Sequence, residues 1–227
     1  MQRIENWGDT VLPAAFRPKV PIAGCIKIGE VKKGANGSAV ASKLSHFWYA
    51  TGSATSQGYH GAHPDFAQEN ASKPKEVRIE LVSDDPEVNL EIGRTMNGRG
   101  VVLCHSDAAG KAMRRMKPNG TIDPNAEFVE VQAGACGDHC SFSRQKQCKL
   151  ASVLRFRIPG RTPLGHVWQF RTLGWNSAQE LLGSMVTLRE MAGGHLAGLP
   201  LKLTIHEQKR SPIVNGARQT TTFFSVG

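Results

Sequence analysis

The sequence predicts an α+β fold, with a mainly antiparallel sheet and one clear helix in the C-terminal half. Two observations lead to this prediction. Apolar and polar residues alternate in several short segments, which is the pattern of strands with one buried face. One later segment instead has apolar residues at helical spacing. With 227 residues, of which 40% are hydrophobic, the chain is long enough to bury one substantial core.

Two predicted parts make up the chain. Residues 1–21 contain three prolines and predict an irregular N-terminal arm. Residues 22–227 are predicted to form a single domain, in which residues 51–74 are a long loop and residues 84–91 a short helical turn. The predicted strands are residues 22–30, 44–50, 77–81, 101–104, 128–131, 150–158, 167–173, 201–205 and 220–226.

The predicted helix covers residues 178–192. Its apolar face consists of Leu181, Leu182, Met185, Val186 and Leu188. Ser177 and Glu180 have the spacing of a capping box, in which the hydroxyl accepts from a free amide and the carboxylate bonds back. Gly193 and Gly194 can adopt the left-handed conformation that ends a helix.

The sequence also bears on location. No apolar run approaches the ~20 residues that a membrane helix needs. The first residues lack the apolar stretch of a signal peptide. Five cysteines are an odd and sparse set for a disulfide framework. We therefore expect a reducing, cytoplasmic setting without membrane contact.

Positive charge is concentrated in the middle of the chain. Residues 94–171 hold 13 Lys or Arg and 5 Asp or Glu, so most of the net charge of +9 lies there. A concentrated positive field attracts polyanions or an acidic protein surface. Within this stretch a basic cluster is predicted to contact nucleic acid: Arg144, Lys146, Lys149, Arg155 and Arg157. An acidic protein partner and plain solvation remain the alternatives.

The same stretch contains the sharpest motif. Four cysteines could supply the tetrahedral thiolate shell of a structural zinc: Cys104, Cys136, Cys140 and Cys148. We predict a zinc-stabilised loop, formed by an insertion around residues 104–149. His105 or His139 could replace one cysteine, and scattered buried thiols are the competing interpretation. Cys25 lies in an apolar strand and is predicted to be a core residue.

Catalytic chemistry is not predicted. His60, His63 and Asp65 lie in one loop, but Gly61 and Pro64 argue against the helix that would present both rings together. The glycine-rich turn at residues 193–198 follows a helix and so lacks the strand–loop–helix setting of a phosphate loop. We therefore expect a protein that is not an enzyme and has no small-molecule substrate.

Pieces of the chain, in order, resemble the recombination directionality factor-like proteins of phages and mobile elements. They are Ile26 to Gly29, Lys43 to Phe47 with Thr51, Leu103-Cys104 with Asp107, Cys136, Cys140, Cys148 to Leu150, Phe170 to Thr172, Asn176-Ser177 and Leu196 to Leu203. The resemblance covers roughly residues 22 to 205. It implies an accessory factor that binds a serine integrase on DNA and favours excision. The alternative is a zinc-containing nucleic-acid-binding protein that acts in replication, repair or an RNA-guided effector complex.

Overall fold

The fold was analysed in a computed structural model of the whole chain. The structure describes residues 20–33, 39–53, 61–98, 101–106, 111–131, 140–145, 147–210, 213–214, 217–218 and 221–227. Its strands are β1 (Ile22–Lys33), β2 (Ala39–Ala50), β3 (Glu76–Leu81), β4 (Leu90–Gly98), β5 (Val101–Ser106), β6 (Ala112–Arg115), β7 (Phe128–Val131), β8 (Cys148–Arg157), β9 (Val167–Thr172), β10 (Pro200–Arg210), β11 (Ile213–Val214), β12 (Ala217–Arg218) and β13 (Thr221–Val226). Its helices are a 3-10 turn (Pro64–Phe66), α1 (Ala67–Ser72), α2 (Pro86–Asn89), α3 (Ser141–Arg144) and α4 (Trp175–Met191).

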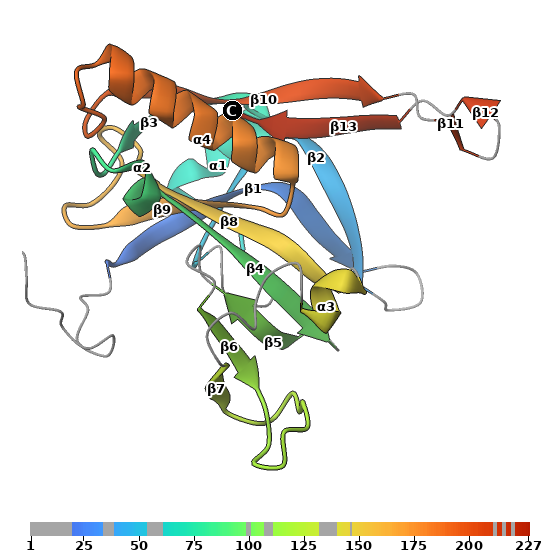
Figure 1. Cartoon of the computed structure of the whole chain (residues 1–227). Coiled ribbons are helices and arrows are strands. Elements are labelled where there is room, and N and C mark those ends of the chain that lie inside the picture. Colours follow the sequence, from blue (N-terminus) through green and yellow to red (C-terminus); the bar gives the residue numbers. More distant parts are fainter. Residues whose placement is uncertain are drawn as a thin grey trace, which may run out of the picture.

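Eleven of the described strands form one sheet that branches at β8. Its main path runs β13-β10-β3-β8-β4-β5-β6-β7, and β9, β1 and β2 extend from the other edge of β8. The pairings between these strands are antiparallel except for β1 with β9, which is parallel. Figure 1 shows α4 at one end of the molecule and β5 to β7 projecting at the other. The predicted antiparallel sheet with few helices is confirmed.

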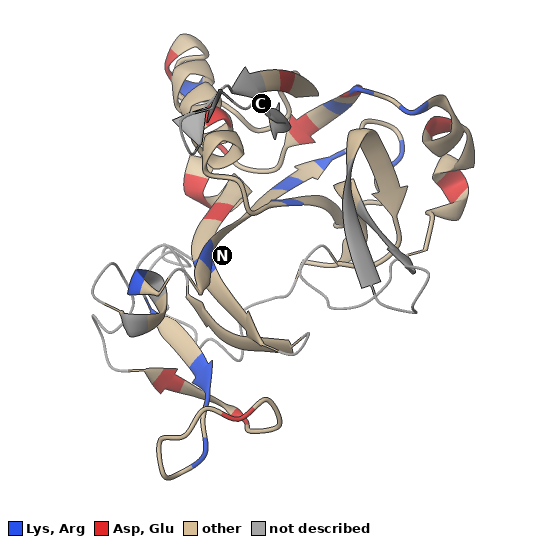
Figure 2. Ribbon diagram, turned by 90° about the vertical axis from the view of Figure 1, so that its right-hand side faces the viewer, with Lys and Arg blue, Asp and Glu red and all other residues tan. Residues whose placement is uncertain are grey.

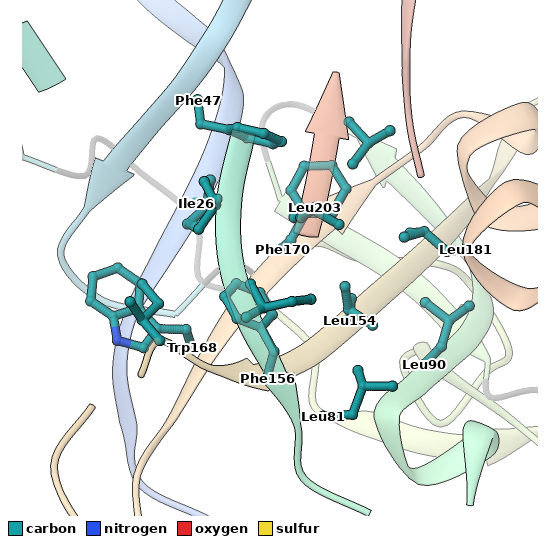
Figure 3. Packing of buried hydrophobic residues seen from close by; sticks show 14 of the residues in the cluster. Ile26, Phe47, Leu81, Leu90, Leu154, Phe156, Trp168, Phe170, Leu181 and Leu203 are labelled. Carbon is teal, nitrogen blue, oxygen red and sulfur yellow. The ribbon is translucent and has the colours of Figure 1, made fainter. Parts of the chain in front are cut away.

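The core lies between the two branches of the sheet and beneath α4. Large side chains fill it, and Phe47, Phe156 and Trp168 are completely buried (Figure 3). The rings of Phe47 and Phe170 meet edge to face, with their centroids 6.3 Å apart. Such aromatic pairs add to the free energy of burial because the edge of one ring carries the charge opposite to the face of the other. Cys25 is buried, as predicted, in a smaller cluster with Ala50.

Helix α4 begins three residues earlier than predicted, and the predicted capping box is wrong. Gly174 is the N-cap and no side chain caps the first turn. The Ser177 hydroxyl instead accepts a hydrogen bond from the backbone N–H of Val226 at 3.0 Å, so it ties the helix to β13. At the other end Gly193 and Gly194 have φ of 65° and 97°, which confirms the predicted glycine stop.

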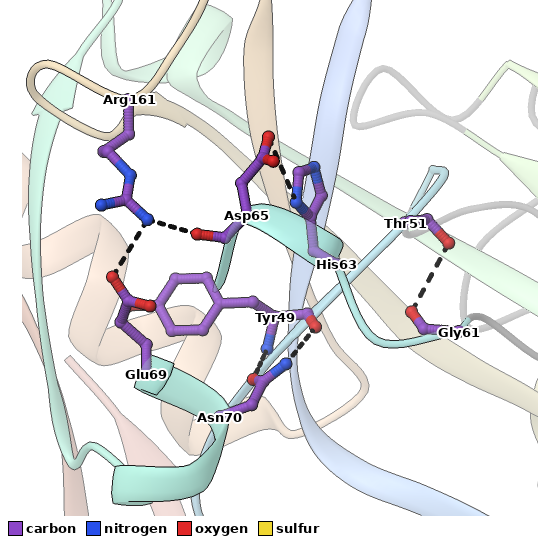
Figure 4. A network of polar contacts seen from close by, with 8 residues as sticks. All are labelled: Tyr49, Thr51, Gly61, His63, Asp65, Glu69, Asn70 and Arg161. Atoms are coloured by element: carbon purple, nitrogen blue, oxygen red, sulfur yellow. Dashed lines mark hydrogen bonds and ion pairs between the residues drawn. The ribbon is translucent and has the colours of Figure 1, made fainter. Parts of the chain in front are cut away.

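The predicted loop at residues 51–74 contains more structure than its composition indicated. Its described part includes the 3-10 turn and α1. The Asn70 side chain accepts from the backbone N–H of Tyr49 at 2.7 Å and donates to its carbonyl at 3.0 Å (Figure 4). Arg161 pairs with Glu69 at 3.1 Å and stacks on the ring of Phe66. These contacts join the loop to the core.

Candidate functional site

Strand β8 has two different faces, and the predicted site residues divide between them. Residues at even positions, such as Leu154 and Phe156, point into the core. Residues at odd positions point to the opposite, outer face of the sheet because side chains alternate along a strand. Lys149, Arg155 and Arg157 therefore form a row on the outer face.

The structure places three of the five predicted nucleic-acid-binding residues on one face of β8, with Lys149 and Arg157 about 26 Å apart along the strand. Lys149 and Arg157 are exposed. Arg155 forms an ion pair with Glu91 on β4. Arg144 is exposed on α3, which packs against the other face of the sheet, and Lys146 lies outside the described residues. Figure 2 shows that both signs of charge are interspersed, with basic segments along the central strands.

A hollow lies on the outer face, between β5 and β9. It has a volume of about 310 Å³ and is lined by Glu91, Gly93, Arg94, Thr95, Val102, His105, Ser106, Ala151, Val153 and Arg171. Gly93 and Ala151 are directly opposite each other in the β4–β8 ladder. Since neither carries a side chain larger than a methyl group, the space above them stays open.

Arg171 is a lining residue that sequence reasoning did not select. It is partly buried, and its Nε atom is buried without a hydrogen-bond partner among the described residues. Burial lowers the pKa of its guanidinium below the usual value. The signal in the sequence was the alternation of residues 167–173, which places Arg171 on the face opposite the core residue Phe170.

The opposite face carries three of the predicted zinc ligands. Cys104 and Cys148 are the cross-strand partners of Met96 on its two sides, so all three side chains point to one face. Arg114, the partner of Cys104 on β6, donates from its guanidinium to the Cys140 sulfur at 3.9 Å. These thiols thus surround Met96 and Arg114 beneath α3.

The zinc prediction requires the sulfur atoms of its cysteines to lie close together, so the distance between Cys104 and Cys148 matters. Two strand spacings, about 9–10 Å, separate the backbones of Cys104 and Cys148. Sulfur ligands of one zinc are within about 4.6 Å of each other, twice the Zn–S distance. Among the described residues no group of three or more His, Cys, Asp or Glu could hold a metal ion. Cys136 and His139 lie outside these residues, and the four-cysteine site stays a prediction.

Strands β5, β6 and β7 form a projecting arm (Figure 1). Arg115, the last residue of β6, joins β5 to the loop at the tip of the arm: its Nε donates to the Val102 carbonyl at 3.2 Å and a terminal nitrogen donates to the Ala126 carbonyl at 2.6 Å. Its guanidinium also lies 4.3 Å from the centre of the Phe128 ring. The large apolar side chains of the arm, such as Leu103 and Met113, are only partly buried, so cation–π contacts and hydrogen bonds contribute to holding it together.

These features define a sheet-based α+β protein with a charged outer face, a hollow and a projecting arm. In the described part of the chain no helix is long and apolar enough to cross a membrane.

The chain belongs to the recombination directionality factor-like family, described as Gp3-like, whose model matches residues 23–226. This match covers nearly the whole chain and confirms the resemblance. Family membership indicates an accessory role in DNA recombination, with partners among the proteins and DNA of that process. Comparisons with curated proteins and with solved structures found no match.

Proposed function

We propose that the protein is an accessory factor, without chemistry of its own, that binds a serine integrase on DNA and favours recombination of the excision sites. The observation that carries this proposal is the family match over residues 23–226. The projecting arm and the outer face of β8 give such a factor extended surfaces for partners.

The proposed mechanism requires only selective binding. The factor need only bind one conformation of the integrase–DNA complex better than another, because such selective binding shifts the equilibrium toward that conformation. A tenfold difference in affinity corresponds to about 1.4 kcal/mol, which lies within the usual range of coupling free energies.

DNA beside the integrase is the second proposed contact. Lys149 and Arg157 support it because both are exposed on one face, where they can approach phosphates. The same observation favours the second candidate function, a protein that binds nucleic acid without an integrase.

A reconstituted recombination reaction tests the proposal. Substrates carrying the integration pair or the excision pair of attachment sites are incubated with the integrase encoded in the same element, with and without this protein. We expect the protein to raise the yield from the excision pair about tenfold or more and to lower that from the integration pair. Unchanged yields from both pairs would contradict the proposal.

Charge-reversal variants test the proposed DNA contact. Replacing Lys149→Glu and Arg157→Glu should reduce excision, because both cations face the proposed DNA path. The matched control is Lys73→Glu with Lys75→Glu, an equal change of charge at exposed positions near α1. Equal losses in both double variants would argue against a specific DNA contact on β8.

We also propose a structural zinc held by Cys104, Cys136, Cys140 and Cys148. Three of these thiols lie on one face of the sheet near α3, which supports it, but Met96 separates Cys104 from Cys148, so the ion would have to draw these two thiols together. Metal analysis of protein purified without chelators should find one zinc per chain. Cys136→Ser and Cys148→Ser should lose it, whereas Cys25→Ser, remote in a core strand, should keep it. Wild-type protein without zinc would contradict the proposal.

A further inference from the structure

The hollow on the outer face is built by the strand register. Gly93 and Ala151 form its floor because they oppose each other in the β4–β8 ladder. Val153 pairs with Arg171 on β9, which places the guanidinium at the edge of this floor. The volume of about 310 Å³ is in the range of small ligand pockets and can admit one side chain of a partner.

Arg171 lacks the counter-charge that its position calls for. Its guanidinium forms no hydrogen bond or ion pair with any residue that the structure describes, and its Nε is buried. The carboxylate that lines the same hollow, Glu91, is already paired with Arg155. Burying the Nε–H of a guanidinium without an acceptor costs free energy. An unsatisfied, partly buried cation in a cleft marks a candidate site for an anionic ligand.

We propose that this hollow receives the carboxylate of an Asp or Glu side chain on a protein partner, which pairs with the guanidinium of Arg171. The inference rests on the proposed function, because it describes how the integrase is held. Arginine suits this role because its planar fork matches a carboxylate through two parallel hydrogen bonds. Arginines in recessed positions are also frequent among the residues that dominate interface energies.

The surroundings favour a carboxylate over a DNA strand. A phosphodiester chain needs several unpaired cations in line, whereas Arg155, in the row beside Arg171, is already paired with Glu91. The Glu91 carboxylate disfavours a phosphate chain at the hollow itself, while Lys149 and Arg157, near the two ends of β8, stay open to the DNA. A single acidic side chain can enter the hollow and reach Arg171 without passing along that row.

The main experiment measures the affinity of the protein for the integrase bound to attachment-site DNA. Arg171→Gln should weaken binding about 10- to 100-fold, the effect of losing hydrogen bonds to a charged group at a partly buried site. Arg171→Lys should restore only part of the affinity, because lysine keeps the charge and loses the fork. The matched control Arg189→Gln, an exposed cation on α4 that does not line the hollow, should weaken binding about threefold or less.

The melting temperature of the free protein separates binding from structure. Arg171→Gln should not lower it, since no described residue depends on the guanidinium. A clear drop would overturn the inference by giving Arg171 a structural role, as would wild-type affinity for the integrase. Weakened binding of Arg171→Gln to bare DNA would assign the site to phosphates and would also overturn it.

A second experiment, without integrase, tests the inference even if the proposed function fails. Glutarate is titrated into the ¹⁵N-labelled protein, with inorganic phosphate as the comparison. We expect saturable shifts of the Gly93 and Ala151 amide signals with glutarate in the wild type and none in Arg171→Gln. Absent shifts, or larger shifts with phosphate, would overturn the inference. If the wild-type protein does not bind the integrase but shows these shifts with glutarate, only the proposed function is contradicted.

Discussion

The core region and the arm of this protein are held together by different forces. Between the branches of the sheet, fully buried aromatic and aliphatic side chains pack against one another. In the arm of β5, β6 and β7, the buried side chains are small, such as Cys104 and Ala112, and arginines lie over the rings of Phe128 and Phe142. The hydrophobic effect therefore stabilises the first region, whereas the second depends on a few polar contacts, and we expect it to open locally more readily.

The largest expected effect comes from emptying the core. Phe156→Ala removes a completely buried ring and should lower the free energy of unfolding by about 3–5 kcal/mol, measured by chemical denaturation. Leu164→Ala is the control, because that side chain is 96% exposed and its loss should cost less than about 0.5 kcal/mol. Similar decreases in the free energy of unfolding for both variants would contradict the view that hydrophobic burial holds the core region.

A smaller and local effect is expected in the arm. Arg115→Ala removes two hydrogen bonds and a cation–π contact. Their loss should lower the free energy of local unfolding of the arm by about 1–3 kcal/mol. Hydrogen exchange should become faster in β5 to β7 and stay unchanged in β8 and β9. Equally faster exchange throughout the sheet would show that the arm and the core unfold as one unit.

The smallest effect concerns a polar contact at the edge of the core. The Asp84 carboxylate accepts from the backbone N–H groups of Ala197 and Leu196, at 2.8 and 2.7 Å. These bonds hold the pKa of Asp84 below its usual range. The stabilisation that the Asp84 carboxylate gives the fold is therefore present above the pKa of Asp84 in the unfolded state. It is lost as the pH falls through the lower pKa of Asp84 in the folded state.

Asp84→Asn should therefore lower the melting temperature slightly at neutral pH. The difference from the wild type should shrink in strong acid, where the carboxylate is protonated in both states. Melting curves over this pH range check the prediction. A difference that does not depend on pH would mean that the charge of Asp84 contributes nothing.

The sequence predicted those elements whose own pattern is strong. Strand β8 and the glycine stop after α4 followed from alternation and from backbone freedom. Strand β4 was missed because Gly93, Arg94 and Asn97 have little intrinsic preference for strands. It becomes a strand because β5 and β8 supply hydrogen-bond partners on both sides.

The site was predictable only where it lies on one element. Lys149, Arg155 and Arg157 share a face because they share a strand, and simple alternation shows this. The hollow requires the register between β4, β8 and β9, which sequence patterns do not specify. Ser177 failed as a cap for the same reason, since its partner Val226 is distant in sequence.

A gel-shift titration of attachment-site DNA at two salt concentrations, with and without the integrase, tests the central claim most directly. We predict that this protein further retards the integrase–DNA complex and leaves bare DNA unshifted at physiological salt. Tight, steeply salt-dependent binding to bare DNA, together with no effect on the integrase complex, would contradict the account and favour a general nucleic-acid-binding protein.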